Sequence, residues 1–120
     1  TTQVVSQIGS RHMEVIERWG EMLRSNRYVR RSWLGEDMLS RGTWSEPVIV
    51  LATAPGTCYP DGHPLPHPYC LLEGHHRLGY LRSMATDELP LQPEHQVWIC
   101  RPVRDTQTFL PANPASEINF

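Results

Sequence analysis

The sequence predicts a single α/β domain of the α+β kind, in which helices pack on a small mixed sheet of about three or four strands. Three observations predict this class. Apolar residues recur at helical spacing early in the chain, and short apolar runs at 48–51, 69–72 and 96–100 are bounded by turn residues. With 120 residues, 39% hydrophobic and 20% charged, the chain has the composition of a soluble globular domain with one core.

The first helix is expected from Ser10 to Ser25. Thr1 to Gly9 is polar and expected to fray at its start, whereas Ser10 is a suitable N-cap. The apolar residues at helical spacing are Ile8, Val15, Ile16, Trp19, Met22 and Leu23. Charged residues occupy the other face, so the helix is expected to serve packing rather than binding.

The segment Asn26 to Ser32, NRYVRRS, is the most basic part of the chain. Tyr28 and Trp33 interleave its arginines, a pattern that single-stranded nucleic acids can use. The flanking helices carry acidic residues that reduce the local positive charge, so a solvated helix face or turn is the favoured interpretation.

A second helix and the first strand follow. Trp33 to Arg41 is expected to be helical and to end at Gly42, because glycine adopts the left-handed conformation that closes many helices. Its apolar side consists of Leu34, Met38 and Leu39. Val48 to Leu51 is an apolar, β-branched strand, with Pro47 at its start where a missing N–H does little harm.

Ala54 to Pro68 is an insertion with five prolines and two glycines. Long loops in compact domains often carry function, so this one is expected to fold over the sheet edge or over a ligand cleft. Residue types that bind zinc occur at Cys58, His63, His67 and Cys70. Their spacing matches no standard zinc finger and Cys70 is expected to point into the sheet, so we favour a proline-stiffened loop and assign no metal site.

The chemistry is expected in Tyr69 to Met84, YCLLEGHHRLGYLRSM. Tyr69 to Leu72 is a short buried strand, Glu73-Gly74 ends it, and His75 begins an amphipathic helix. A glycine at such a turn lets the backbone approach a ligand, and the N–H groups and dipole of a helix N-terminus favour an anion. Arg77 adds a planar cation that can bind phosphate through two hydrogen bonds.

The remainder is a loop from Thr86 to Glu94, a strand from Gln96 to Cys100 and a tail. We therefore divide the chain into residues 1–33, an amphipathic helix and basic connector; residues 34–103, the core with its insertion at 54–68; and residues 104–120, a loosely docked tail.

The run Glu-Gly-His-His-Arg-Leu, from Glu73 to Leu78, resembles the (D/E)-G-H-H-R signature of the ParB/sulfiredoxin-like superfamily. The flanks are similar to that family too: a helix, glycine and P-(I/V)-x-V strand within Leu34 to Leu51, and a further strand within His95 to Arg101. The resemblance covers about Leu34 to Pro102 and implies a ParB/sulfiredoxin-like fold.

The resemblance implies a nucleotide-binding site. The phosphate-binding residues would be Glu73, Gly74, His75, His76 and Arg77, and the ligand a nucleoside triphosphate or diphosphate with Mg²⁺, which Glu73 would hold through water. His75 or His76 would donate a hydrogen bond or move a proton. Glu36 is a positional candidate for the catalytic base of relatives that phosphorylate a small molecule. The protein would be an NTP-dependent switch or a small-molecule phosphotransferase.

The sequence also departs from the family. No helix-turn-helix segment follows the domain, so recognition of DNA sites is not expected. The sulfiredoxin type has a cysteine where this chain has His75, so repair of cysteine sulfinate is not expected. The net charge of −2 provides no long-range attraction for DNA, which leaves a nuclease or nucleic-acid binder as the weaker alternative.

A different class of function stays open, namely a non-catalytic interaction module such as an inhibitor, immunity or accessory protein. Its protein partner would bind at Trp33 and Trp44 or at the proline-rich loop. Nucleotide binding requires Arg77 to be exposed in a pocket, whereas internal pairing of Arg77 with Glu73 and a filled cleft would favour the interaction module.

The expected compartment is the cytoplasm. No apolar run approaches the ~18 residues that span a membrane. The cysteines Cys58, Cys70 and Cys100 are an odd number, and Cys70 and Cys100 lie in expected strands as small buried side chains. A membrane partner is therefore not expected.

Overall fold

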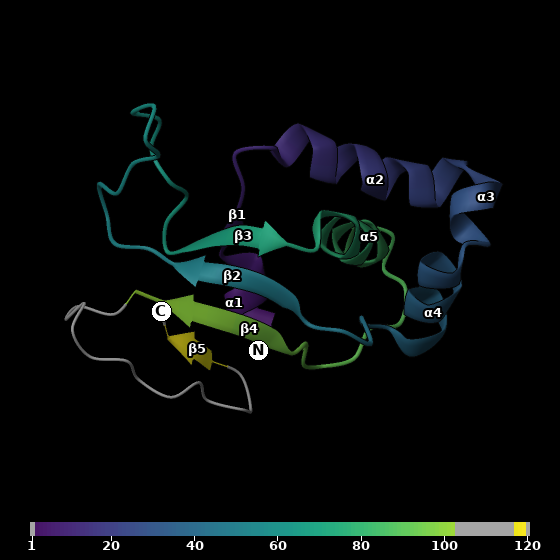
Figure 1. Cartoon of the computed structure of the whole chain (residues 1–120). Helices are drawn as coiled ribbons and strands as arrows, with labels where there is room; N and C mark the ends of the chain where they lie inside the picture. Colours follow the sequence, from purple (N-terminus) through teal and green to yellow (C-terminus); the bar gives the residue numbers. More distant parts are fainter. Residues whose placement is uncertain (1, 103–116, 120) are drawn as a thin grey trace.

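The chain folds around a five-stranded mixed sheet (Figure 1). The computed structural model describes residues 2–102 and 117–119. The strands are β1 (Ile8–Gly9), β2 (Val48–Ala52), β3 (Tyr69–Glu73), β4 (Val97–Arg101) and β5 (Glu117–Asn119). Their order in the sheet is β1-β3-β2-β4-β5. The expected mixed α/β class is confirmed, and β2, β3 and β4 are the three strands that the sequence predicts.

The two edge strands are the unexpected part of the sheet. β1 pairs with β3 in parallel, with Ile8 opposite Tyr69, in a segment whose polar sequence predicts no strand. β5 pairs in parallel with β4. Strands of two and three residues are too short to show an alternating pattern, so their existence depends on the neighbouring strand. The expectation of a loosely docked tail otherwise falls on residues outside those described.

The helices are α1 (Thr2–Ser6), α2 (Met13–Ser25), α3 (Arg27–Arg30), α4 (Trp33–Arg41) and α5 (His75–Thr86). α2 begins at Met13 rather than at Ser10, because the Ser10 hydroxyl accepts the N–H of His12 at 3.0 Å before the helix starts. α4 has the expected bounds and ends at Gly42, whose φ of 71° is left-handed.

One hydrophobic core joins the sheet and the helices. Its largest fully buried side chains are Ile16, Met38, Val48, Val50, Leu78 and Met84. Ile8, Ile16 and Leu23 from the first thirty-three residues belong to the same core as the strands. The amphipathic helix α2 therefore serves packing, as its pattern predicts.

Glycines let α2 cross α5 at close range; in Figure 1, α2 runs across the view and α5 is seen end-on. A Cβ atom added to Gly79 would lie 2.3 Å from the carbonyl oxygen of Ile16, and one added to Gly20 would lie 2.6 Å from the carbonyl oxygen of Gly79. Because both contacts are with backbone, neither can be relieved by a rotamer change. The close packing of α2 on α5 holds α5 in place against the sheet.

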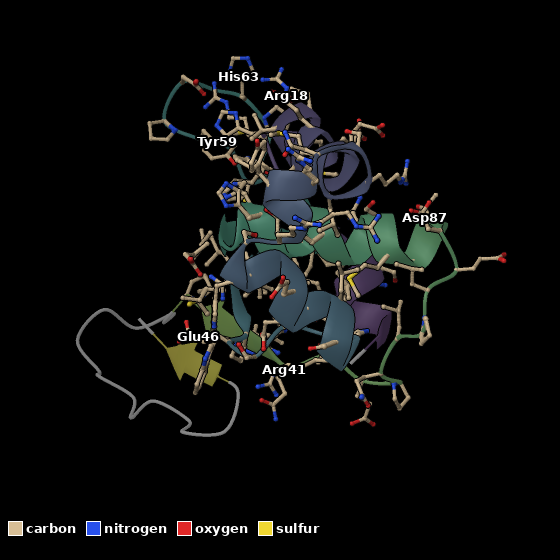
Figure 2. All side chains as sticks on the ribbon, turned by 90° about the vertical axis from the view of Figure 1, so that its right-hand side faces the viewer. Arg18, Arg41, Glu46, Tyr59, His63 and Asp87 are labelled. Atoms are coloured by element: carbon tan, nitrogen blue, oxygen red, sulfur yellow. The ribbon has the colours of Figure 1, made fainter. Side chains whose placement is uncertain are left out.

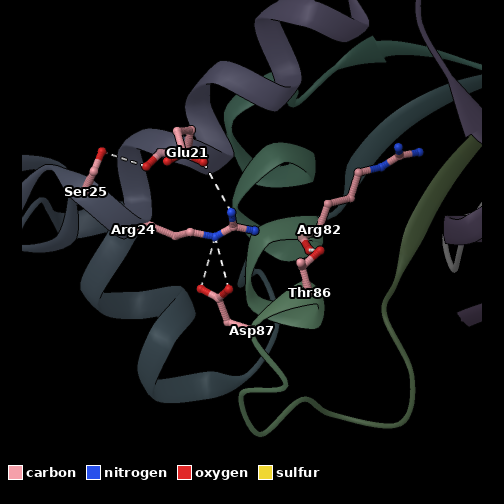
Figure 3. Close-up of polar contacts among 6 residues, drawn as sticks. All are labelled: Glu21, Arg24, Ser25, Arg82, Thr86 and Asp87. Carbon is pink, nitrogen blue, oxygen red and sulfur yellow. Dashed lines mark hydrogen bonds and ion pairs between the residues drawn. The ribbon is translucent and has the colours of Figure 1, made fainter.

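Polar contacts at the far end of α5 support the same packing (Figure 3). Arg24 on α2 donates to the Asp87 carboxylate at 3.1 Å and to Glu21 at 3.2 Å. Arg82 points away from Arg24 and donates to the carbonyl oxygen of Ile8 at 2.8 Å. Arg82 thus ties α5 to β1.

The described residues contain no helix with the length and apolarity needed to cross a membrane. All three cysteines are free thiols. Cys70 and Cys100 are buried as expected, and Cys58 is exposed in the proline-rich loop.

The glycine contacts predict that a Gly→Ala substitution within α5 destabilises the protein, the opposite of its usual effect in a helix. Gly→Ala inside a helix normally stabilises it by about 1 kcal/mol. We expect Gly79→Ala to lower the free energy of unfolding by about 1–3 kcal/mol, because the added methyl overpacks the α2–α5 interface. Urea denaturation measures this change. Arg18→Ala, an exposed position on α2, is the control, and a more stable Gly79→Ala variant would contradict this packing.

His95 predicts a pH dependence of stability. Its side chain is buried, with Nδ1 2.7 Å from the Thr43 hydroxyl, and burial lowers its pKa. The unfolded chain therefore binds a proton more readily, and stability falls as pH drops from about 6.5 towards the lower pKa of the folded state. We expect His95→Gln to reduce the loss of stability between about pH 7.5 and 5.5 in urea denaturation. An unchanged loss of stability in His95→Gln would contradict this assignment.

Candidate functional site: a cleft at the start of helix α5

The site begins at the turn from β3 to α5, where two separate constraints require glycine at position 74. Gly74 has φ 108° and ψ 34°, a left-handed conformation that other residues rarely adopt. A Cβ atom at this position would also lie 2.5 Å from Cγ1 of Val48 on β2. The first helical hydrogen bond, from the N–H of Leu78 to the carbonyl of Gly74, follows at 2.9 Å. The tight turn therefore fixes where α5 starts relative to the sheet.

A cleft of about 590 Å³ lies at this turn. Its lining residues are Trp33, Leu34, Ser45, Glu46, Leu72, Glu73, Gly74, His75, His76 and Arg77. All five residues expected to bind phosphate, Glu73 to Arg77, are among them. The structure thus brings the motif together with the start of α4 and the segment before β2.

The backbone of α5 presents hydrogen-bond donors at this cleft. The N–H groups of His75, His76 and Arg77 precede the first helical bond, and none has an acceptor among the described residues. No side chain caps the helix at Gly74. These donors and the positive end of the helix dipole are the features that bind an anion.

Arg77 lines the cleft but is held by the protein. Its Nη1 donates to the carbonyl oxygens of Glu46 at 2.9 Å and Pro47 at 3.1 Å, and its Nη2 donates to the Glu73 carboxylate. Its side chain is only 13% exposed. The guanidinium therefore joins α5 to the chain before β2, a positioning role that differs from the free phosphate ligand expected from the sequence.

The two histidines differ in their surroundings. The His76 ring lies 3.8 Å from the Trp19 ring and 6.3 Å from the Tyr80 ring, measured between centroids. Partial desolvation lowers the pKa of His76, helped by its neighbours His75 and Arg77, although the residue as a whole is exposed. His75 is half-buried and has no hydrogen-bond partner among the described side chains. Both histidines line the cleft, and His75 is the one without a ring contact among the described residues.

Two carboxylates lie in the cleft, from Glu46 and Glu73. Mg²⁺ commonly binds one or two protein carboxylates together with the phosphates of its ligand and several waters. The described residues contain no group of three or more His, Cys, Asp or Glu side chains that could hold a metal alone. The donor set therefore suits Mg²⁺ that arrives with phosphate.

Glu36 is not brought to the site. It is exposed on α4 and is not among the residues that line the cleft. Glu46, whose position is labelled in Figure 2, is the acidic residue that the fold places there instead. Spacing along the chain cannot distinguish Glu36 from Glu46, because the turn between α4 and β2 decides which of these glutamates lies near α5.

Trp33 and Leu72 are cleft residues that the sequence analysis does not assign to the site. Trp33 is 73% exposed at the beginning of α4. Leu72 is 46% exposed rather than buried, whereas its neighbour Leu71 is only 5% exposed. Alternation of side chains along the strand could not have separated Leu72 from Leu71, because Cys70, on the same side of the strand as Leu72, is buried.

The proline-rich loop borders a second cleft, of about 480 Å³. The two clefts share Leu72 and His75 as lining residues. Arg11 holds the loop, because it donates to the Asp61 carboxylate at 2.5 Å and lies 4.8 Å from the centroid of the Tyr59 ring. Tyr59 lies with the loop beside the start of α2 (Figure 2).

The four zinc-type residues of this region are not brought together. Nδ1 of His67 lies 2.7 Å from the carbonyl oxygen of Thr53, and Nδ1 of His63 lies 3.3 Å from Arg11. Cys58 is exposed, whereas Cys70 is buried with its sulfur 3.5 Å from the Tyr59 hydroxyl. That contact and burial raise the pKa of Tyr59 to about 12.

Compared with protein-family models, with curated proteins and with solved structures, the chain shows no significant match. The resemblance to the ParB/sulfiredoxin-like superfamily therefore stays a prediction that rests on the motif from Glu73 to Leu78 and its flanks.

The contacts of Arg77 predict a stability effect. We expect Arg77→Ala to lower the free energy of unfolding by about 1.5–3 kcal/mol, the usual contribution of hydrogen bonds to a charged group. Arg77→Lys should recover only part of it, because an ammonium cannot reproduce the fork that spans Glu73 and two carbonyls. Urea denaturation tests both, with Arg18→Ala on exposed α2 surface as control. Equal stability of all three variants would refute the positioning role.

Proposed function

We propose that the cleft at the start of α5 binds the phosphates of a nucleotide, and that the protein acts as a nucleotide-dependent switch or a small-molecule phosphotransferase. The observation that carries this proposal is that the N–H groups of His75, His76 and Arg77 lack acceptors among the described residues beside a cleft of about 590 Å³. An anion with several acceptor oxygens suits such a group of donors.

The phosphate would lie against the first turn of α5. The missing side chain of Gly74 makes room for Val48 rather than for the ligand, so the phosphate would be bound by the N–H groups of His75, His76 and Arg77. Ser45 lines the same cleft and contributes a hydroxyl group. Arg77, held by Glu73 and two carbonyls, keeps the turn in shape and adds positive charge close to the phosphate.

The rest of the nucleotide would use the wall of the cleft formed by α4. Trp33 presents a largely exposed indole on which a base can stack. Glu46 and Glu73 would bind Mg²⁺ that also contacts the phosphates, which offsets the repulsion between the carboxylates and the phosphate.

His75 is the candidate for proton transfer. It lines both clefts, so it lies between the proposed nucleotide site and the space beneath the proline-rich loop. His76 is assigned to packing against Trp19 instead, because the two rings are in contact, although His76 is exposed. Glu36 carries no role in this proposal, since it does not line the cleft.

A glutamate at position 75 tests the proposal while preserving the fold. An acidic residue in the first turn of a helix is favourable for the helix, yet it repels a phosphate bound at the same N–H groups. We expect one of ATP, ADP, CTP or GTP with Mg²⁺ to raise the melting temperature of the wild type; a ligand at ~100 times its Kd adds about 2.7 kcal/mol. His75→Glu should abolish this rise without lowering the melting temperature of the free protein.

The matched control is His63→Glu, which adds the same charge in the exposed loop and should leave the nucleotide response intact. Removal of Mg²⁺ should weaken the response. A nucleotide response that persists in His75→Glu would place binding elsewhere and contradict the proposal.

One observation favours the second candidate, a non-catalytic interaction module. Arg77 is paired internally with Glu73, which is half of the condition set out for that function. The other half is not met, because the cleft retains its space. Trp44 is 4% exposed and donates its indole N–H to the carbonyl of Gln96 at 2.7 Å, so it offers no surface to a partner. If no nucleotide changes the melting temperature, Trp33 and the proline-rich loop become the surface to test.

A further inference from the structure

The corner between α2 and α4 carries a surface that the proposed nucleotide site does not use. α3 occupies this corner and begins at Asn26, whose side chain accepts the N–H groups of Tyr28 and Val29 at 2.9 and 3.2 Å. Val29 packs against the core, whereas the other three side chains of α3 are exposed, and α3 has no fully buried residue. Figure 1 shows α3 at the edge of the molecule, next to α4. We call residues 27–33 the corner surface.

The corner surface is positively charged. Arg27, Arg30 and Arg31 are all exposed, and none forms an ion pair with a carboxylate among the described residues. Arg11, Arg24, Arg41 and Arg77, by contrast, each pair with a carboxylate. The net charge of −2 describes the whole chain, whereas screening at physiological salt limits a charge to about 8 Å, so a ligand at the corner responds to the local charges, namely these three arginines and the exposed Glu36 one turn after Trp33.

Two aromatic side chains complete the corner surface. Tyr28 is 74% exposed and Trp33 is 73% exposed, although burial of rings of this size is strongly favourable. The Arg27 guanidinium lies 5.2 Å from the centroid of the Tyr28 ring, which orients the ring. Flat exposed rings beside unpaired arginines are the combination that binds bases by stacking and phosphates by charge.

Trp33 connects this surface to the cleft. It lines the cleft wall and also ends the corner surface, so a ligand can run from Tyr28 past Trp33 to the N-terminus of α5. An acidic peptide would use the arginines but would leave both rings without a stacking partner. A polymer with phosphates and flat bases uses all of these groups.

We propose that the ligand of this protein is a single-stranded nucleic acid, whose terminal nucleotide occupies the cleft while the neighbouring nucleotides lie across the corner surface. The placement of the terminal nucleotide rests on the proposed function above. The neighbouring nucleotides would contact Tyr28, Arg27, Arg30 and Arg31, and this part of the inference is independent of the proposed function.

The test compares a strand with a single nucleotide. Fluorescence anisotropy measures binding of labelled oligothymidylate and oligouridylate of about ten nucleotides, a length that such surfaces commonly cover. Competition with unlabelled mononucleotide measures binding at the cleft alone. A polyglutamate peptide of equal length tests whether any acidic polymer binds the corner surface. We expect the oligonucleotides to bind more tightly than the mononucleotide, with a salt slope of about −2 from three arginines at about −0.7 per phosphate.

Tyr28→Ala is the deciding variant, because Tyr28 lies outside the cleft. It should weaken oligonucleotide binding by at least about fivefold through loss of one stacked base, and leave mononucleotide binding unchanged. Arg30→Ala should reduce the salt slope, whereas Arg18→Ala, an exposed arginine of α2 outside the corner, should change neither quantity.

The outcomes separate the two proposals. Mononucleotide binding with no gain from a longer strand overturns the corner surface and leaves the nucleotide site standing. Oligonucleotide binding that depends on Tyr28 and is not competed by mononucleotide supports the corner surface and overturns the proposed function. Equal binding of polyglutamate, or oligonucleotide binding unaffected by Tyr28→Ala, overturns the nucleic-acid inference.

Discussion

The contact between Gly74 and Val48 is the constraint on which the rest of the structure depends. A side chain at Gly74 would lie 2.5 Å from Val48 and would also have to adopt a left-handed conformation. The absence of that side chain lets β3 pass into α5 within one residue. The start of α5 is thereby held against the sheet, and its free N–H groups face a cleft instead of the core.

The same region combines structural and ligand-binding groups within five residues. Arg77 and His76 stabilise the turn, one through Glu73 and two carbonyls and the other through the Trp19 ring. The N–H groups of the first turn and the side chain of His75 remain for a ligand. Arg77 is the member of the motif whose side chain is mostly buried, so this one side chain holds the turn while the backbone can still present donors to an anion.

Much of the fold follows from local patterns. The amphipathic helix α2, the glycine stop of α4 and the three central strands agree with the sequence to within a few residues, because each depends on side-chain periodicity or on a single turn residue. β1 and β5 could not be predicted, since strands of two or three residues have no periodicity and form only beside a partner. The exposure of Leu72 could not be predicted for a related reason, because a continuous apolar run does not reveal which of its residues faces solvent.

For the candidate site, the sequence alone determined the turn, the helix start and the five residues from Glu73 to Arg77, because these are neighbours in the chain and their chemistry is local. Only the tertiary structure decided that Glu46 and Trp33 face this turn while Glu36 does not, and that Trp44 is buried. It also decided that Arg77 is held by the carbonyls of Glu46 and Pro47. These are contacts between segments about thirty residues or more apart, and long-range packing of α4 and β2 against α5 sets them; no local pattern encodes which side chains meet there.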